Sequence, residues 1–241
     1  MRKLLLMGML ACNLFLSGCS VVDEYFLPPA DDTVQEIFES GNDAMREKNY
    51  SQAIVYYTRI KDEYPFSPYV IEAELALADA QYLDNEYLLA ADAYKDFETL
   101  HPRHEAIPYV LYQIGMSLKN SYTSIDHSAT AVSEALEYFT RLQQEYPDTE
   151  YGKNAAEQIA ACRKTLAQRE LFIANVFWGM ENYQAAWTRY QYVVRTYPDV
   201  TEEAEYARTK GEAAYLKYRK EEAQSIREHQ QGSWKDWFRW L

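Results

Sequence analysis

A spacing pattern that recurs four times along the chain constrains its fold more than any other feature of the sequence. Each copy has an alanine, an aromatic residue at +4, an apolar residue at +7 and a proline at +12. The first three residues share one face of a helix, and the proline falls just past its end because proline cannot continue a helix. Each copy therefore predicts one helix with its stop signal. The copies are Ala53-Tyr57-Ile60-Pro65, Ala90-Tyr94-Phe97-Pro102, Ala135-Phe139-Leu142-Pro147 and Ala186-Tyr190-Val193-Pro198.

A second helical pattern precedes each of these helices. In three copies a small residue lies twelve positions before the alanine, namely Gly41, Ala78 and Ala174. A small residue there lets two helices approach closely. These spacings resemble the tetratricopeptide repeat, a 34-residue helix pair that stacks into a superhelix because one pair cannot bury its apolar face alone. In the third copy the equivalent Gly115 lies eight residues too early, which predicts an insertion around 122–128.

Two further helices are predicted from apolar residues spaced 4, 3 and 4 apart. The sequence therefore predicts an all-α solenoid of ten helices in five stacked pairs, with repeats one to three in 34–147 and repeats four and five in 148–229. No convincing strand pattern is present. The two sets are Ala155, Ile159, Cys162 and Leu166, and Ala207, Gly211, Ala214 and Tyr218.

The N-terminus has the pattern of a secretory signal. Arg2 and Lys3 precede an apolar run that is too short to span a bilayer and that ends in Leu16-Ser17-Gly18-Cys19. This ending resembles the bacterial lipobox, so residues 1–18 are predicted to be a signal peptide. The resemblance implies that Cys19 becomes the N-terminus and carries a diacylglycerol and an N-acyl chain.

The segment 19–33 is rich in acidic residues and proline, which indicates a lipidated tether rather than part of a core. Ser20 stands where aspartate would, by the usual lipoprotein sorting rule, favour retention in the inner membrane. That resemblance points to the outer membrane, with the body facing the periplasm.

Composition argues against several classes of function. The chain has 24 basic and 37 acidic residues, so it lacks the basic footprint of a nucleic-acid binder. With Cys12 removed and Cys19 lipidated, Cys162 is the one remaining thiol and no intrachain disulfide can form. We interpret His101 and His104 as loop residues, and we expect no metal and no cofactor besides the lipid. Asp79 and the other acids are expected on solvated helix positions, which argues against an enzyme.

Two strings carry a more specific resemblance. They are Tyr64-Pro65-Phe66-Ser67-Pro68-Tyr69 and Tyr109-Val110-Leu111-Tyr112-Gln113-Ile114-Gly115. Together with the lipobox, the tether and the repeats, they resemble the BamD family, the lipoproteins of the β-barrel assembly machinery, over residues 19–220. The insertion departs from the family, because Ile125-Asp126-His127-Ser128 stands where members often carry a basic, aspartate-rich string.

The resemblance implies a scaffold that promotes folding and insertion of outer-membrane proteins without covalent chemistry. Its C-terminal repeats would bind the POTRA region of BamA, its N-terminal repeats would meet unfolded outer-membrane proteins, and other Bam lipoproteins are candidate partners. Arg189 aligns with a family arginine implicated in the BamA contact; a helix charge paired with a neighbouring acid is the alternative. A general periplasmic adaptor for cell-wall enzymes or pilus assembly, and an enzyme carried on helical repeats, remain alternative functions.

Repeat superhelices turn their first helices inward, which predicts a peptide groove on repeats one to three. Aromatic residues and methionine suit extended hydrophobic segments, such as the aromatic-ended C-terminal strand of an outer-membrane protein. The alternative is that several of these residues simply pack between helices. The groove residues are Phe38, Asn42, Met45, Leu75, Tyr82, Tyr109, Tyr112 and Met116.

The C-terminal tail, residues 230–241, has an aromatic pattern of its own. Trp234, Trp237, Phe238 and Leu241 recur at i, i+3, i+4 and i+7, beside Lys235 and Arg239. The charged run 217–228 is expected to extend the last helix and to project this tail away from the repeats. A cap on the last helix, an anchor in a partner's groove and a foot in the membrane interface remain open, and we favour a partner or membrane contact.

Overall fold

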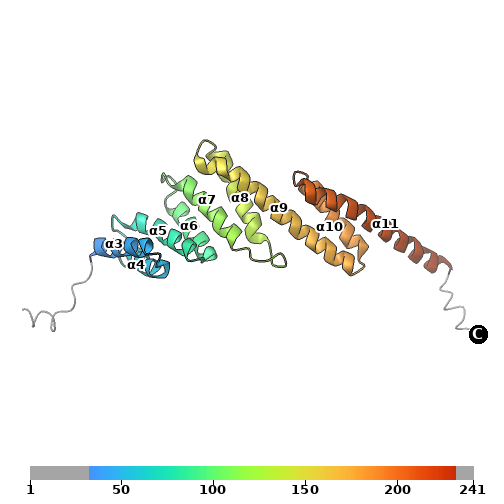
Figure 1. The fold of residues 1–241 in the computed structure, drawn as a ribbon, viewed down its shortest axis with the longest axis horizontal. Coiled ribbons are helices and arrows are strands. Elements are labelled where there is room, and N and C mark those ends of the chain that lie inside the picture. The colour runs from blue at the N-terminus through green and yellow to red at the C-terminus, as the bar shows by residue number, and fades with distance from the viewer. Residues whose placement is uncertain (1–32, 232–241) are drawn as a thin grey trace, which may run out of the picture. The chain divides into compact units, whose positions relative to one another are not determined.

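The computed structural model describes residues 33–231, and its regular elements there are all α-helices (Figure 1). The described chain divides into two compact units, 33–73 and 74–231, which are treated separately below. The all-α prediction is confirmed. The helices are α3 (Val34–Arg46), α4 (Tyr50–Glu63), α5 (Val70–Leu83), α6 (Tyr87–Leu100), α7 (Ile107–Asn120), α8 (Thr130–Glu145), α9 (Glu150–Gly179), α10 (Tyr183–Thr196) and α11 (Thr201–Gln231).

The predicted stop signals are confirmed at all four prolines. Helices α4, α6, α8 and α10 each end two residues before their proline. The residue between, such as Tyr64 or His101, leaves the helical conformation with φ of −129° and −127°. This follows from the clash between a proline ring and the preceding residue, which disfavours the helical region.

The prediction of ten helices is wrong by one within residues 33–231, because α9 is a single helix of 30 residues where the sequence predicted two. The stretch from Ala167 to Glu170 joins the two predicted helices, and it consists of strong helix formers without glycine or proline. Lys119 of α7 reaches Gln158 in the first half of α9, and Tyr190 of α10 reaches Asn175 in the second half. Helix α9 therefore joins the third repeat to the fourth.

The small residues of the first helices lie against aromatic rings of the second helices. A Cβ added to Gly41 would lie 2.6 Å from Tyr57 Cε1, and one added to Gly115 would lie 2.6 Å from Phe139 Cζ. Both rings are fully buried. The predicted close approach of the paired helices is therefore confirmed in these two repeats.

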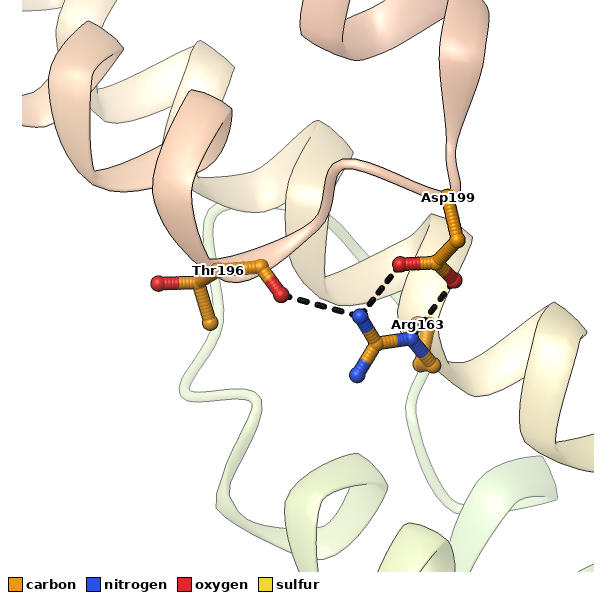
Figure 2. Close-up of polar contacts among 3 residues, drawn as sticks. All are labelled: Arg163, Thr196 and Asp199. Carbon is orange, nitrogen blue, oxygen red and sulfur yellow. Dashed lines mark hydrogen bonds and ion pairs between the residues drawn. The ribbon is translucent and has the colours of Figure 1, made fainter.

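The loop between α10 and α11 is fastened to α9 by one arginine (Figure 2). The Arg163 guanidinium donates to Asp199 Oδ2 at 2.7 Å and to the Thr196 carbonyl at 2.9 Å, and its second contact with the carboxylate makes the pair bidentate. It also lies 5.2 Å from the ring centre of Tyr197. The hydrogen bond from Arg163 lowers the pKa of Asp199. This clamp fixes where α11 begins relative to α9.

Several predicted features fall outside residues 33–231, the part of the chain that the structure describes. The signal peptide, Cys19 and the tether precede residue 33, and the aromatic segment 232–241 follows residue 231. The expected extension of the last helix is confirmed, since α11 continues to Gln231. Among the helices of residues 33–231, none is both long enough and apolar enough to cross a bilayer.

Replacing Gly115 by alanine should destabilise the chain, because the new methyl group overlaps the buried Phe139 ring. We expect a loss of about 1–3 kcal/mol in the free energy of unfolding, as is usual for overpacking. Gly179 at the end of α9 is the matched control, since an added Cβ meets nothing within 4 Å. Gly179→Ala should change the same quantity by less than about 1 kcal/mol. Urea unfolding followed by circular dichroism measures both, and equal effects would contradict the packing argument.

Candidate functional site

A hydrogen bond links the two helices in three of the four repeats. The tyrosine of the second helix donates its hydroxyl to a polar side chain fifteen positions earlier. The pairs are Tyr57 with Asn42 at 2.8 Å, Tyr94 with Asp79 at 2.5 Å and Tyr190 with Asn175 at 2.6 Å.

Each acceptor directly follows the small residue of its first helix. In the third repeat the aromatic residue is Phe139, which has no hydroxyl, and the residue after Gly115 is Met116. A polar acceptor therefore occurs where a hydroxyl must be satisfied, as expected for buried polar groups. The spacing of fifteen residues between a tyrosine and its polar acceptor is visible in the sequence, but our sequence analysis did not recognise it.

Asp79 is the one acid among these acceptors, and its expected solvated position is wrong. Its Oδ1 accepts hydrogen bonds from Tyr94 and, at 2.6 Å, from Tyr109, whose hydroxyl in turn accepts one from Gln113. Loss of water around the carboxylate raises the pKa of Asp79, and the two tyrosine bonds offset only part of this effect. Burial also raises the pKa of Tyr94 and Tyr109. The network therefore joins α5, α6 and α7 through neutral hydroxyl donors.

The side-chain amide of Asn175 likewise accepts hydrogen bonds from two tyrosines. Asn175 Oδ1 accepts from Tyr190 and, at 3.1 Å, from Tyr206, which joins α9, α10 and α11. One side-chain oxygen can thus accept from two tyrosines without carrying a charge.

The predicted groove residues are half-buried in both units. In the first unit, the Phe38 ring lies 6.0 Å from that of Tyr57 and 5.3 Å from that of Tyr69. Asn42 and Met45 lie on the same helix, α3. In this unit Phe38 therefore packs against its neighbours and Asn42 accepts the Tyr57 bond, as the alternative interpretation expected for some groove residues.

In the second unit, Leu75 and Met116 are half-buried, and the tyrosines make defined contacts. The rings of Tyr109 and Tyr112 lie 5.5 and 5.6 Å from that of Tyr151 on α9, and we call these three residues the tyrosine cluster. Tyr82 accepts a hydrogen bond from Asn120 at 2.9 Å. These contacts fix the rings in place while part of each surface stays exposed.

Arg189 lies on α10 with 44% of its side chain exposed, and its Nη1 is 3.0 Å from Glu170 Oε2 on α9. The ion pair that we named as the alternative is therefore present in the isolated chain. Its carboxylate is largely covered, whereas its guanidinium faces outward, so the pair offers a cation at the surface of α10.

His101, His104 and Cys162 lie in structural positions. Within residues 33–231 no group of three His, Cys, Asp or Glu side chains could hold a metal ion. His101 pairs with Glu74 at 2.7 Å, and His104 accepts from the Ala106 amide at 3.2 Å, so both serve the loop before α7. Cys162 is buried, and burial raises the pKa of its thiol to about 11.

A known protein family matches nearly all of the described residues. The sequence profile named YfiO, described as an outer membrane lipoprotein, matches residues 30–230. The chain belongs to the YfiO family of outer membrane lipoproteins.

Relatives with an established name support the same assignment. The outer membrane protein assembly factor BamD of Neisseria meningitidis serogroup A is 28% identical over 210 residues, which cover 82% of this chain and 78% of the relative. The BamD proteins of Vibrio cholerae and Xylella fastidiosa strain 9a5c are each 28% identical. These matches cover 83% of this chain and 85% of the Vibrio protein, and 80% of this chain and 70% of the Xylella protein. The resemblance to the BamD family is confirmed.

Replacing Asp79 by asparagine should change how stability depends on pH. The folded-state pKa of Asp79 is raised, so this carboxyl binds its proton more tightly in the folded chain than in the unfolded chain. Its contribution is therefore most favourable at low pH and is lost as the pH rises from its ordinary pKa through the raised one. Asparagine keeps the two tyrosine bonds without ionising, as Asn175 does. We expect Asp79→Asn to raise the melting temperature at pH 7, with a smaller gain at pH 4.

The exposed Asp96 on the neighbouring helix provides the control. Thermal melts of wild type, Asp79→Asn and Asp96→Asn at the two pH values separate a desolvated carboxyl from a general charge effect. An Asp79→Asn effect of equal size at both pH values would contradict the assignment.

Proposed function

We propose that this chain is a lipid-anchored scaffold of outer-membrane protein assembly, held on the periplasmic face of the outer membrane by Cys19. The observation that carries the proposal is the family match across the whole helical body, with relatives that are named outer membrane protein assembly factors. We propose further that the C-terminal repeats bind the POTRA region of BamA and that the inner helices bind unfolded outer-membrane proteins. Binding, rather than covalent chemistry, is the means by which such a scaffold acts.

The tyrosine cluster supports the proposed client site. An extended hydrophobic segment presents aromatic and aliphatic side chains to its receptor, and aromatic residues dominate the energetics of such contacts. Because the rings of Tyr109 and Tyr112 already pack against Tyr151, binding has little conformational entropy to remove from them.

Arg189 supports the proposed BamA site in a different way. Its guanidinium is oriented by Glu170 but remains partly exposed, so it can add an interaction with an acidic side chain of a partner. Arginine is enriched at such interface anchors because its planar group forms two parallel hydrogen bonds with a carboxylate.

Removing the rings of Tyr82 and Tyr112 should weaken client binding. We expect Tyr82→Ala and Tyr112→Ala each to reduce affinity about tenfold, the scale of an aromatic anchor, for a synthetic peptide with an aromatic-ended C-terminal strand sequence. Tyr82→Phe and Tyr112→Phe are the controls, since they keep the ring and lose only the hydroxyl. Fluorescence anisotropy measures the affinities, with circular dichroism as a check of the fold. Unchanged binding by the folded alanine variants would place the client site elsewhere.

Reversing the charge of Arg189 should weaken binding to the soluble POTRA region of BamA, measured by calorimetry. Loss of one partner of a desolvated charge pair costs about 2–5 kcal/mol, so we expect at least a tenfold loss. Arg208→Glu is the control, because Arg208 is exposed on α11 and its ion pair among residues 33–231 is with Glu205 of the same helix. Glu170→Gln should retain binding, since it leaves the guanidinium in place. Unchanged affinity of Arg189→Glu would contradict a role of Arg189 in binding BamA and would leave it as an ordinary solvent-exposed charge on α10.

Affinity capture from a detergent-extracted envelope tests the function as a whole. The proposal requires BamA among the proteins that the chain captures, and less of it with Arg189→Glu. Peptidoglycan synthases or hydrolases in its place would support the general adaptor. Mass spectrometry of the same preparation should show an N-terminal peptide that begins at an acylated Cys19.

A further inference from the structure

A pocket of about 430 Å³ lies beside the second half of α9 and the first turns of α11. Its apolar lining comes from Leu171 and Phe172 of α9, Tyr206 of α11 and Ile125 of the insertion. Phe172, Ile125 and Tyr206 are each 38–40% exposed, although all three are large. The volume falls within the range of about 300–1,000 Å³ that is typical of ligand-binding pockets.

The insertion 122–128 forms one wall of this pocket. Arg169 of α9 donates from Nε to the His127 carbonyl at 2.6 Å, which ties the insertion to the helix that carries the pocket. Within the loop, the His127 amide donates to the Ser124 carbonyl at 3.2 Å, and the Ser124 hydroxyl donates to Asp126. These bonds hold Ile125, which lies between the two partners, at the edge of the pocket. The wall is therefore built by the part of the chain that departs from the family pattern.

The rim of the pocket is negative. Glu203 is buried and has two partners, Gln168 at 2.8 Å and Lys164 at 3.8 Å. Glu202 is exposed, and no ion pair with another residue of 33–231 engages its carboxylate. An occupant that combines an aromatic side chain with an adjacent cation would therefore complement the pocket in both shape and charge.

We propose that this pocket binds the C-terminal segment Ser233–Leu241 of a second copy of the chain. This segment carries three tryptophans and one phenylalanine, and Arg239 lies between Phe238 and Trp240. Its aromatic residues supply the anchor for the apolar lining, and Arg239 or Lys235 supplies the cation for Glu202. Neither the tyrosine cluster nor Arg189 lines the pocket.

Chain length decides between the chain's own tail and that of a second copy. From Glu203 to Gln231 helix α11 rises about 42 Å, at 1.5 Å per residue. The ten residues that follow span at most about 35 Å when fully extended. Arg239 lies eight residues past Gln231, at most about 28 Å, so a chain cannot place this cation against its own Glu202, whereas a neighbouring chain can.

A synthetic peptide of residues 233–241 tests the pocket directly, with the full mature chain in mild detergent as receptor. We expect binding that Phe172→Ala and Glu202→Lys each weaken at least threefold, while Leu88→Ala has no effect. Leu88 is the matched control because it is a large, exposed apolar residue outside the pocket. A peptide with Arg239→Glu should bind the Glu202→Lys chain more tightly than the wild-type peptide does. Absence of peptide binding, or equal binding to the pocket variants, would overturn the proposal.

Analytical ultracentrifugation tests the second copy as occupant. The full mature chain should associate as its concentration rises, and deletion of 233–241 or Phe172→Ala should abolish that association. Added peptide should compete with it. A chain that stays monomeric would overturn the second copy as occupant. Tail-dependent binding to phosphatidylethanolamine vesicles that Phe172→Ala leaves unchanged, without self-association, would assign the tail to the membrane and overturn the proposal.

Discussion

The contact of an aromatic ring with the backbone of the neighbouring helix sets the spacing of the helix pairs. In the first and third repeats, Tyr57 and Phe139 lie so close to Gly41 and Gly115 that even a methyl group has no room. Protein interiors are packed as densely as organic crystals, so such a contact leaves few alternative arrangements of the pair. Within residues 74–231, each pair then buries its remaining apolar face against the next helix.

The aromatic residue of the second helix also determines which side chain the first helix carries next to the ring. A tyrosine brings a hydroxyl into the space between two helices, and the neighbouring helix must supply an acceptor, as Asn42, Asp79 and Asn175 do. The third repeat avoids this requirement with Phe139 and presents Met116 instead. The polar residues Asn42, Asp79 and Asn175 on the first helices thus follow from the packing of tyrosines of the second helices.

Much of this fold could be predicted from local patterns, because its second helices carry their own apolar face and their own stop signal. The four prolines end their helices as expected, since the restraint that proline imposes acts within two residues. The length of α9 could not be obtained by reading repeats, which assume a break in each unit. Nothing between Leu166 and Leu171 supplies such a break.

The contacts of Asp79 and Arg189 at the candidate sites could not be predicted from local sequence patterns. The role of Asp79 depends on Tyr109, thirty residues away, and the pairing of Arg189 depends on Glu170, nineteen residues away on another helix. Such pairings depend on how separate helices pack together, which local sequence patterns do not show. The match between tyrosine and its acceptor at a spacing of fifteen was an exception, because the repeat shows it several times.

Because α9 is one continuous helix, it fixes the distance between the two candidate surfaces that lie along it. Tyr151, which belongs to the tyrosine cluster, and Glu170, which orients Arg189, lie on this one helix. Nineteen residues of helix separate them by about 28 Å along the axis. A loop at this place would let the two surfaces drift apart, whereas a helix fixes both their distance and their angular phase. Adding or removing one residue between them would shift that distance by about 1.5 Å and turn one surface by about 100° relative to the other.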